Sequence, residues 1–320
     1  MALHFHRLGH TVSLAPRRLE QALEMSSRRE NQEYLPDFPL PQSLQIGWQV
    51  APLLLEADAV FLACPSHGLR EACQRVAAAR EEAHSLRAVF SLAKGMEEDS
   101  NALSSEIIAA ELPGLRAGSL TGPTYAREVA EGKPAAMVLG MEGAEEEQAT
   151  WRTALSGGAV RIYSSTDTKG IELGGALKNV YAIASGVADG LGLGDNAKAA
   201  LLTRSLAEMV RLGEHLGARR ETFYGLSGFG DLVATCFGPW SRNREFGEKI
   251  GSGNRIEDLL KNRKTVVEGY RATRNFFQLC QKRGLEAPIL LQTQAILTGE
   301  KSPRQALEDL LERDLRAEPE

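Results

Sequence analysis

Gly170-Ile-Glu-Leu-Gly-Gly-Ala-Leu-Lys-Asn-Val180 is the stretch that divides this chain, because it reads as the helix that opens a second, helical domain. On a helix, the residues three and four positions before Lys178 are Gly175 and Gly174. Glycine in a helix interior costs about 1 kcal/mol relative to alanine, so two adjacent glycines call for a reason. One reason is the close approach of another segment or a ligand beside the ammonium group. The alternative is tight helix packing around a lysine that reaches solvent.

The hydrophobic periodicity changes at this helix. Residues 1–165 alternate short apolar runs with helical stretches, which predicts an α/β domain with a parallel sheet covered on both faces. Residues 166–320 are dominated by long helical patterns, which predict an all-helical domain. The predicted strands are 10–14, 59–64, 87–92, 117–120, 135–139 and 160–163, and the predicted helices of the second half are 168–188, 197–216, 242–251, 266–283, 288–298 and 303–313.

Several residues of the second half carry signals for helix ends. Asp195 is predicted to cap the helix 197–216, and Gly217 is predicted to end it. Ser302-Pro303 places a capping residue before a proline, which predicts a helix start there.

The overall charge and the cysteines exclude several classes of protein. The formal net charge is −5, whereas nucleic-acid-binding proteins usually carry a basic balance. No apolar run approaches the length that spans a bilayer, so we expect no membrane partner. The four cysteines form no CxxC pair and no cysteine–histidine cluster with zinc spacing. We therefore expect no metal site and a reducing, cytoplasmic environment.

Polar side chains follow the predicted strands at their carboxyl ends, where open parallel sheets bind ligands. In a dinucleotide-binding fold, the second strand normally ends in an acidic residue that hydrogen-bonds the ribose 2′-hydroxyl group of the cofactor. An arginine at that position instead suits a ribose that carries a 2′-phosphate. Arg17 and Arg18 follow strand 10–14 and so favour NADP over NAD, the alternative being a solvated basic pair in a turn. The other strand ends lead to Pro65-Ser66-His67, Lys94-Gly95 and Thr121-Gly-Pro-Thr-Tyr-Ala126.

The helical half adds two further candidate segments. Ser227-Gly-Phe-Gly-Asp231 is a glycine-rich turn that ends in an acid. Ser241 is a plausible helix cap, and Arg242 and Asn243 follow it in the first turn. A helix N-terminus attracts phosphate through its free N–H groups and its dipole. Capping alone accounts for Ser241 but does not call for the adjacent Arg-Asn pair.

Eight stretches together make the chain resemble bacterial NAD(P)-dependent glycerol-3-phosphate dehydrogenase over nearly its whole length. The resemblance implies a Rossmann-like NAD(P)-binding domain followed by a helical substrate-binding domain. It also implies an enzyme that interconverts dihydroxyacetone phosphate and sn-glycerol 3-phosphate for glycerophospholipid synthesis. The stretches are Pro65-Ser66-His67, Lys94-Gly95, Thr121-Gly-Pro-Thr-Tyr-Ala126, Glu172-Leu-Gly-Gly-Ala-Leu-Lys-Asn179, Asp189-Gly-Leu-Gly-Leu-Gly-Asp-Asn196, Gly228-Phe-Gly-Asp231, Ser241-Arg-Asn243 and Val266-Val-Glu-Gly-Tyr-Arg271.

The same resemblance implies roles for individual residues. Lys178 is the expected catalytic acid/base, and Asp231 is its expected partner. The residues expected around the substrate and its phosphate are Lys94, Gly122, Thr124, Lys178, Asp231, Ser241, Arg242 and Asn243. Those expected at an NADP or NAD cofactor, with NADP favoured, are Arg17, Arg18, Lys94, Ala126, Arg242, Val266 and Glu268.

Lys178 needs a lowered pKa for this role, because free lysine has a pKa of about 10.4 and a good acid/base works near pH 7 to 8. Burial against the glycines and the like charge of Lys94 act to lower the pKa. The countercharge of Asp231 acts to raise it, so the sequence does not decide the net shift.

The beginning of the chain departs from the family pattern. A dinucleotide-binding fold starts with a strand and a glycine-rich turn into the first helix, whereas Met1 to His10 reads as the last turns of that helix. Gly190-Leu-Gly-Leu-Gly194 follows a helix rather than a strand, so it reads as a loop. We therefore expect an N-terminally truncated chain, with the start codon placed too late and the strand encoded upstream.

Two other interpretations stay open at this point. One is a related two-domain reductase that acts on a different small acid. The other is a non-catalytic or degenerate paralogue that cannot hold the cofactor because the glycine-rich turn is missing. A homodimer is one assembly left open, since the sequence does not determine the oligomeric state.

Overall fold

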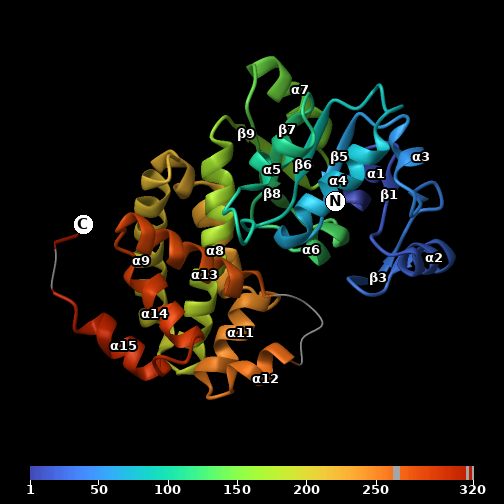
Figure 1. Ribbon diagram of the computed structural model, residues 1–320. Coiled ribbons are helices and arrows are strands. Elements are labelled where there is room, and N and C mark those ends of the chain that lie inside the picture. Colours follow the sequence, from blue (N-terminus) through green and yellow to red (C-terminus); the bar gives the residue numbers. More distant parts are fainter. Residues whose placement is uncertain (262–266, 315–316, 319–320) are drawn as a thin grey trace. The chain divides into compact units, whose positions relative to one another are not determined.

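Two units make up the computed structural model, which describes residues 1–261, 267–314 and 317–318. The first unit comprises Met1–Ala93 and Ala102–Ile171, and the second comprises Lys94–Asn101 and Glu172–Glu320 (Figure 1). The first is an α/β structure and the second is helical, which confirms the predicted order of fold classes. No helix in the described part of the chain is both long and apolar enough to cross a membrane.

A five-stranded sheet forms the centre of the first unit, in the order β5-β6-β7-β8-β9. Neighbouring strands are parallel except β7 and β8, which are antiparallel with Leu120 opposite Leu139. The prediction of a parallel sheet is therefore wrong at this pair, because only the short helix α6 (Ala126–Glu131) connects the two strands. The strands are β5 (Ala59–Leu62), β6 (Ala88–Ser91), β7 (Arg116–Thr121), β8 (Ala135–Met141) and β9 (Val160–Ser165).

Both faces of this sheet are covered, as the continuous apolar runs of its strands require. Successive side chains of β6 point to opposite faces, and all four of its residues are buried. Phe90 packs in a cluster with Leu139 and Ile162, whereas Val89 packs in a second cluster with Ile107. The helices around the sheet include η1 (Ser66–Gly68), α4 (Leu69–Ala79), α5 (Ser104–Glu111) and α7 (Glu145–Leu155).

The first 54 residues form short elements, and α1 (Ala2–Arg7) confirms the helical turns predicted within Met1 to His10. The predicted strand 10–14 is reduced to β1 (Ser13–Leu14), which pairs in parallel with the unpredicted β4 (Gln45–Ile46). Within the described residues this pair is separate from the five-stranded sheet, where β5 pairs with β6 alone. The remaining elements are α2 (Leu19–Arg28), β2 (Glu30–Asn31), β3 (Leu35–Pro39) and α3 (Ala51–Leu54).

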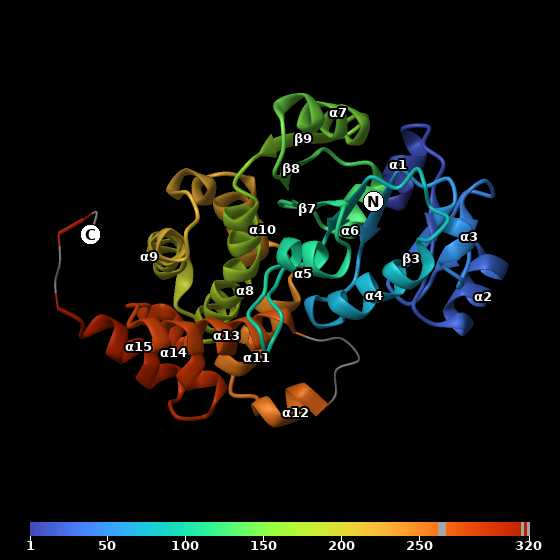
Figure 2. The same ribbon diagram turned by 45° about the horizontal axis from the view of Figure 1, so that its top comes forward.

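The second unit confirms the predicted long helices to within a few residues. Helices α13, α14 and α15 pack side by side in sequence order (Figures 1 and 2). The sequence reading missed η2 (Arg220–Tyr224), η3 (Leu226–Gly230), α10 (Asp231–Phe237) and α12 (Ile256–Lys261). The predicted helices are α8 (Thr168–Gly190), α9 (Gly194–His215), α11 (Arg242–Gly251), α13 (Glu268–Arg283), α14 (Pro288–Leu297) and α15 (Pro303–Leu311).

Of the three helix-end predictions for Asp195, Gly217 and Ser302, two are confirmed. Ser302 caps α15 by accepting a hydrogen bond from the Gln305 backbone N–H at 3.3 Å. Gly217 follows the end of α9 with a φ of +88°. The prediction for Asp195 is wrong, because α9 begins at Gly194 and places Asp195 in its first turn. An acidic residue in the first turn also interacts favourably with the positive end of the helix dipole. An acidic residue near a helix start therefore does not distinguish the N-cap position from the first turn.

Helices α8 and α11 cross with their backbones in contact, and glycines make this approach sterically feasible. A Cβ built on Gly186 would lie 1.9 Å from the Arg244 carbonyl oxygen, and one built on Gly247 would lie 2.0 Å from the Ile183 carbonyl oxygen. Any larger residue would force the helices apart. The crossing therefore holds the start of α11 close to α8.

A buried carboxylate links three helices of this unit. Glu208 of α9 is 1% exposed, and its oxygens accept hydrogen bonds from the Ile289 and Leu290 backbone N–H groups at 3.0 and 2.9 Å. The Tyr181 hydroxyl of α8 donates to it at 3.1 Å. Glu208 therefore satisfies the first N–H groups of α14, which would otherwise be buried without partners.

Replacing Glu208 by glutamine is expected to destabilise the helical unit. The amide nitrogen would face a buried N–H donor, and such an unsatisfied group costs about 1–3 kcal/mol. Urea unfolding should show this loss for E208Q. The matched control is E214Q on the exposed side of the same helix, which should change stability by less than about 0.5 kcal/mol. Equal stability of the two variants would contradict the proposed capping role.

Candidate active site

Lys178 lies in the middle of α8, at a point where another segment contacts the helix backbone. A Cβ on Gly174 would lie 2.9 Å from the carbonyl oxygen of Ser227, in the glycine-rich turn η3. Lys178 itself is only 5% exposed. The structure therefore favours close approach as the reason for the glycines, and the alternative of a lysine that reaches solvent is wrong.

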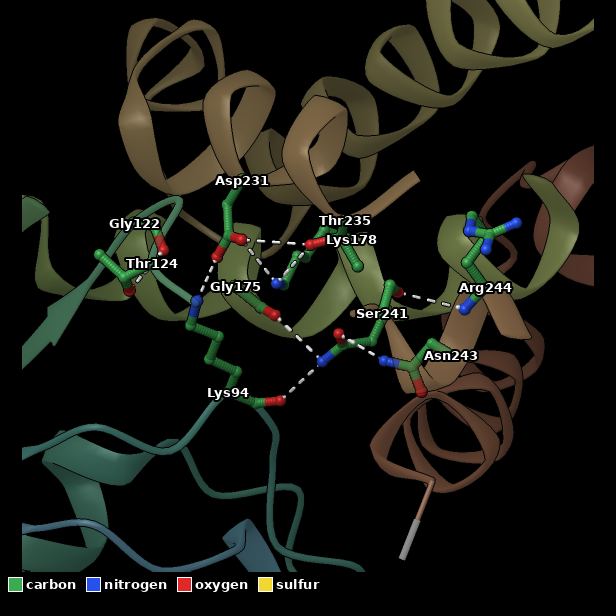
Figure 3. Close-up of polar contacts among 11 residues, drawn as sticks. Lys94, Gly122, Thr124, Gly175, Lys178, Asp231, Thr235, Ser241, Asn243 and Arg244 are labelled. Carbon is green, nitrogen blue, oxygen red and sulfur yellow. Dashed lines mark hydrogen bonds and ion pairs between the residues drawn. The ribbon is translucent and has the colours of Figure 1, made fainter. Parts of the chain in front are cut away.

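The partners of the Lys178 ammonium come from α10, which begins at the end of that same turn. Lys178 Nζ donates to Asp231 Oδ1 at 2.6 Å and to Thr235 Oγ1 at 2.7 Å (Figure 3). The Thr235 hydroxyl in turn donates to Asp231 Oδ1 at 3.2 Å. Asp231 and Thr235 are 2% and 5% exposed, so this cluster is formed in a largely water-free environment.

A second ammonium group shares the same carboxylate. Lys94 Nζ lies 2.5 Å from Asp231 Oδ2, on the side of the carboxylate away from Lys178 (Figure 3). Lys94 belongs to the short segment Lys94–Asn101, which is part of the helical unit. Its side chain is 21% exposed, so it is the more accessible of the two lysines.

The pKa of Lys178 is lowered from its ordinary value to about 8. Burial is the largest cause, because it penalises the charged form, and the like charge of Lys94 adds to it. Asp231 opposes the shift without cancelling it. Burial acts to raise the pKa of Asp231 itself, but the two ammonium groups hold that pKa below its usual range. The carboxylate is therefore ionised while Lys178 can change protonation state near neutral pH.

A chain of amide groups continues from Lys94 into the neighbouring helices. Asn179 Nδ2 donates to the Lys94 carbonyl oxygen at 3.0 Å, and Asn243 Nδ2 donates to Asn179 Oδ1 at 2.8 Å. Asn243 Oδ1 then accepts from the Gly269 backbone N–H at 3.0 Å. These bonds fix the backbone of Lys94 relative to α8, α11 and the start of α13.

Sequence reasoning missed two members of this cluster. Thr235 follows Asp231 by four residues, so both face one side of a helix, but α10 was not predicted. Asn179 directly follows Lys178 in the stretch Gly170–Val180. The signal that could have identified Asn179 is its polar side chain, because a buried amide group needs hydrogen-bond partners.

The start of α11 presents the predicted phosphate-binding residues. Ser241 is buried and caps the helix by accepting from the Arg244 N–H at 3.2 Å, as predicted. Arg242 is exposed in the first turn. Glu268 begins α13 and is half-buried, whereas Val266 lies outside the described residues.

The remaining predicted residues belong to the α/β unit. Gly122 and Thr124 follow the end of β7, where the Thr124 hydroxyl donates to the Gly122 carbonyl oxygen at 3.1 Å. Ala126 is exposed at the start of α6. Arg17 and Arg18 follow β1 and are exposed, each within ion-pair distance of a glutamate on the surface.

The arrangement in the helical unit is suited to proton transfer. A buried lysine with a pKa near 8 can donate or accept a proton at physiological pH, and Asp231 and Thr235 fix the direction of its Nζ. No group of three or more potential metal-ligating side chains occurs among the described residues. Lys178, Asp231 and Lys94 offer acid/base and charge-stabilising groups.

Comparisons with known proteins cover nearly the whole chain. Residues 1–147 match the family model described as NAD-dependent glycerol-3-phosphate dehydrogenase N-terminus, and residues 167–308 match the corresponding C-terminus. A glycerol-3-phosphate dehydrogenase (NAD(P)+) of Syntrophotalea carbinolica is 42% identical, with 97% of this chain and 93% of that protein covered. Glycerol-3-phosphate dehydrogenase (NAD(P)+) 1 of Salinibacter ruber is 39% identical, with 99% of this chain and 93% of that protein covered.

A solved structure gives the same result. The crystal structure of glycerol-3-phosphate dehydrogenase from Coxiella burnetii has a TM-score of 0.90 and 35% identity, with 98% of this chain and 94% of that chain covered. The resemblance inferred from the sequence motifs is thereby confirmed.

The expectation of an N-terminally truncated chain gains no support from the comparisons. The N-terminal family model matches from residue 1. The alignments with the two relatives cover 93% of the length of each relative.

Two substitutions are expected to move the pKa of Lys178 in opposite directions. Lys94→Met removes a like charge and should raise it, whereas Asp231→Asn removes the countercharge and should lower it below about 8. The pKa can be measured from the pH dependence of Lys178 acylation, followed by mass spectrometry. Lys249→Met, on an exposed part of α11, is the control and should leave it unchanged. An unchanged pKa in both variants would show that burial alone sets the pKa.

Proposed function

The chain belongs to the NAD-dependent glycerol-3-phosphate dehydrogenase family, and we propose that it interconverts dihydroxyacetone phosphate and sn-glycerol 3-phosphate. The observation that carries the proposal is the buried lysine with a lowered pKa, held by a carboxylate that a second lysine shares. Carbonyl reduction needs a proton donor and positive charge where negative charge develops. Lys178 and Lys94 supply both.

Lys178 is the proposed acid/base. When bound, the nicotinamide cofactor supplies or accepts the hydride. In the reducing direction the substrate carbonyl oxygen becomes negative, and protonated Lys178 donates its proton to that oxygen. In the oxidising direction neutral Lys178 removes the proton from the hydroxyl group. The pKa near 8 leaves both forms accessible.

Asp231 and Thr235 are proposed to orient this lysine. Their oxygens lie 2.6 and 2.7 Å from Nζ, which leaves the third donor position of the ammonium for the substrate oxygen. Lys94 is proposed to stabilise the developing negative charge. A donor held in place before the reaction costs no reorganisation when the charge develops.

The substrate phosphate is proposed to bind at the start of α11. Arg242 is exposed in the first turn, and the capping Ser241 and buried Asn243 flank it. A helix N-terminus favours an anion, and a guanidinium group binds phosphate oxygens with two parallel hydrogen bonds. From the α/β unit, Gly122 and Thr124 remain proposed substrate contacts.

The α/β unit is proposed to bind the cofactor. The residues present fit the 2′-phosphate of that cofactor but provide no assigned site for its pyrophosphate. Exposed Arg17 and Arg18 at the end of β1 suit a 2′-phosphate, so we propose a preference for NADPH. Ala126 and Glu268 remain proposed cofactor contacts. No glycine-rich turn joins a strand to a long helix in the described residues, so no group is assigned to the pyrophosphate.

The two alternative interpretations make distinct predictions. A reductase for another small acid would not need the Ser241-Arg242-Asn243 helix start, and its activity would not depend on a substrate phosphate. A degenerate paralogue would bind no cofactor and would have no reason to keep Lys178 buried against Asp231. Reduction of dihydroxyacetone phosphate with NADPH, and no reduction of unphosphorylated dihydroxyacetone, would exclude both.

Dihydroxyacetone phosphate reduction is expected to require Lys178 in its protonated form. The reduction rate should therefore fall as the pH rises through about 8, whereas glycerol 3-phosphate oxidation should rise through the same pH. Lys178→Met should lower kcat about 10²–10⁴-fold, as measured by NADPH absorbance. Lys169→Met, an exposed position on the same helix, should retain full activity. Full activity of K178M would rule out the acid/base role.

Arg17 and Arg18 are expected to control the choice of cofactor. Replacing both by alanine removes charge-assisted hydrogen bonds worth about 1.5–3 kcal/mol, so the KM for NADPH should rise about 10–100-fold. The KM for NADH should change little, because NADH lacks the 2′-phosphate. Arg28→Ala on α2 is the control. No increase for either cofactor would instead indicate a solvated basic pair, and equal increases would indicate binding without selection.

A further inference from the structure

The segment Lys94–Asn101 belongs to the helical unit although residues of the α/β unit flank it on both sides in the sequence. It carries Lys94, whose ammonium group shares Asp231 with Lys178. Something must therefore hold this segment against the helices. The amide of Asn179 holds its first residue by donating to the Lys94 carbonyl oxygen at 3.0 Å.

One face of α13 holds the middle of the segment. Arg271, Arg274 and Asn275 are spaced three and four residues apart, so they lie on the same side of the helix. Arg271 Nη1 lies 3.2 Å from Glu98 Oε2, and Arg274 Nη1 lies 3.2 Å from Glu98 Oε1. Asn275 Nδ2 donates to the Glu97 carbonyl oxygen at 3.4 Å.

Glu98 is the only carboxylate of the segment that pairs with two arginines among the described residues. Each of its oxygens binds a different guanidinium group, which fixes the side chain more firmly than a single ion pair. The Asn101 backbone N–H donates to the Glu97 carbonyl oxygen at 3.0 Å, so the segment closes into a turn at this point. The Glu97–Glu98 end of the turn is therefore tied to α13, and the Asn101 N–H ties the other end to Glu97.

We propose that Glu98 is a positioning residue for Lys94, and that its pairing with Arg271 and Arg274 keeps the Lys94 ammonium group at Asp231. Glu98 does not touch the reacting groups. It acts by limiting how often the segment leaves α13, and hence how often Lys94 withdraws from the carboxylate. The structural part of this inference is independent of the reaction, whereas its consequence for catalysis rests on the proposed function.

The consequence follows from the charges that face Lys178. These are Asp231 and Cys236 from α10 and Lys94 from the segment. If Lys94 withdraws, the carboxylate acts on Lys178 alone, so the pKa of Lys178 rises. Weakening the Glu98 pairs should therefore shift the pH profile of dihydroxyacetone phosphate reduction toward higher pH and lower the rate.

The direct test measures how accessible Lys94 is in the full chain. Acetylation by limiting acetic anhydride, followed by mass spectrometry, gives the labelling rate of Lys94 relative to exposed Lys133. Exposed ion pairs of this kind change an equilibrium by about two- to fivefold each, so Glu98→Gln should increase the relative labelling rate of Lys94 about three- to tenfold. Asp99→Asn is the matched control, because exposed Asp99 makes no ion pair within the described segment.

A second set of variants separates positioning from general destabilisation. Arg271→Gln with Arg274→Gln should reproduce the effect of Glu98→Gln, and the triple variant should add nothing, because all three remove the same interaction. Glu98→Asp, which keeps the charge, should restore part of the protection. The pH profile should shift in Glu98→Gln and not in Asp99→Asn.

The outcomes distinguish this inference from the proposed function. Equal labelling of Lys94 in the wild type, Glu98→Gln and Asp99→Asn would overturn the inference, whatever the activity. Absence of dihydroxyacetone phosphate reduction by the wild-type chain would overturn the proposed function, while increased labelling of Glu98→Gln would still support the positioning role.

Discussion

In the helical unit, two ammonium groups share the buried carboxylate of Asp231. Removing charges from water is costly unless they are paired and hydrogen-bonded. Asp231 is 2% exposed and Lys178 is 5% exposed, so neither is stable there without the other. The glycines of α8, the turn that begins α10 and the segment that carries Lys94 all serve to bring these three groups together from distant parts of the sequence.

Two opposing effects determine the pKa of Lys178, and their balance depends on the packing. Burial and the charge of Lys94 lower the pKa, while Asp231 raises it, and the net result is about 8. A looser α8 would admit water, weaken the effect of burial and return the lysine toward its ordinary value. The backbone contact between Gly174 and the carbonyl oxygen of Ser227 is therefore part of the chemistry as well as of the packing.

Much of this could be predicted from the sequence, and the exceptions have physical reasons. Long helices such as α8 and α13 repeat their apolar pattern over many turns, so their positions were predicted within a few residues. Strands of two residues, such as β1 and β4, are too short for any periodicity. The reversed direction of β8 and the role of Thr235 depend on contacts between distant segments, which no local pattern records.

The charge count of the cluster explains how one lysine can change protonation state inside a protein. With Lys178 protonated, two ammonium groups face one carboxylate. With Lys178 neutral, Lys94 and Asp231 still form a complete ion pair, so loss of the proton leaves no buried charge without a partner. If a lysine were paired with an aspartate and no second cation were present, each deprotonation of the lysine would leave the buried aspartate without a countercharge. The second ammonium group removes this penalty, and for that reason the position of Lys94 matters as much as that of Lys178.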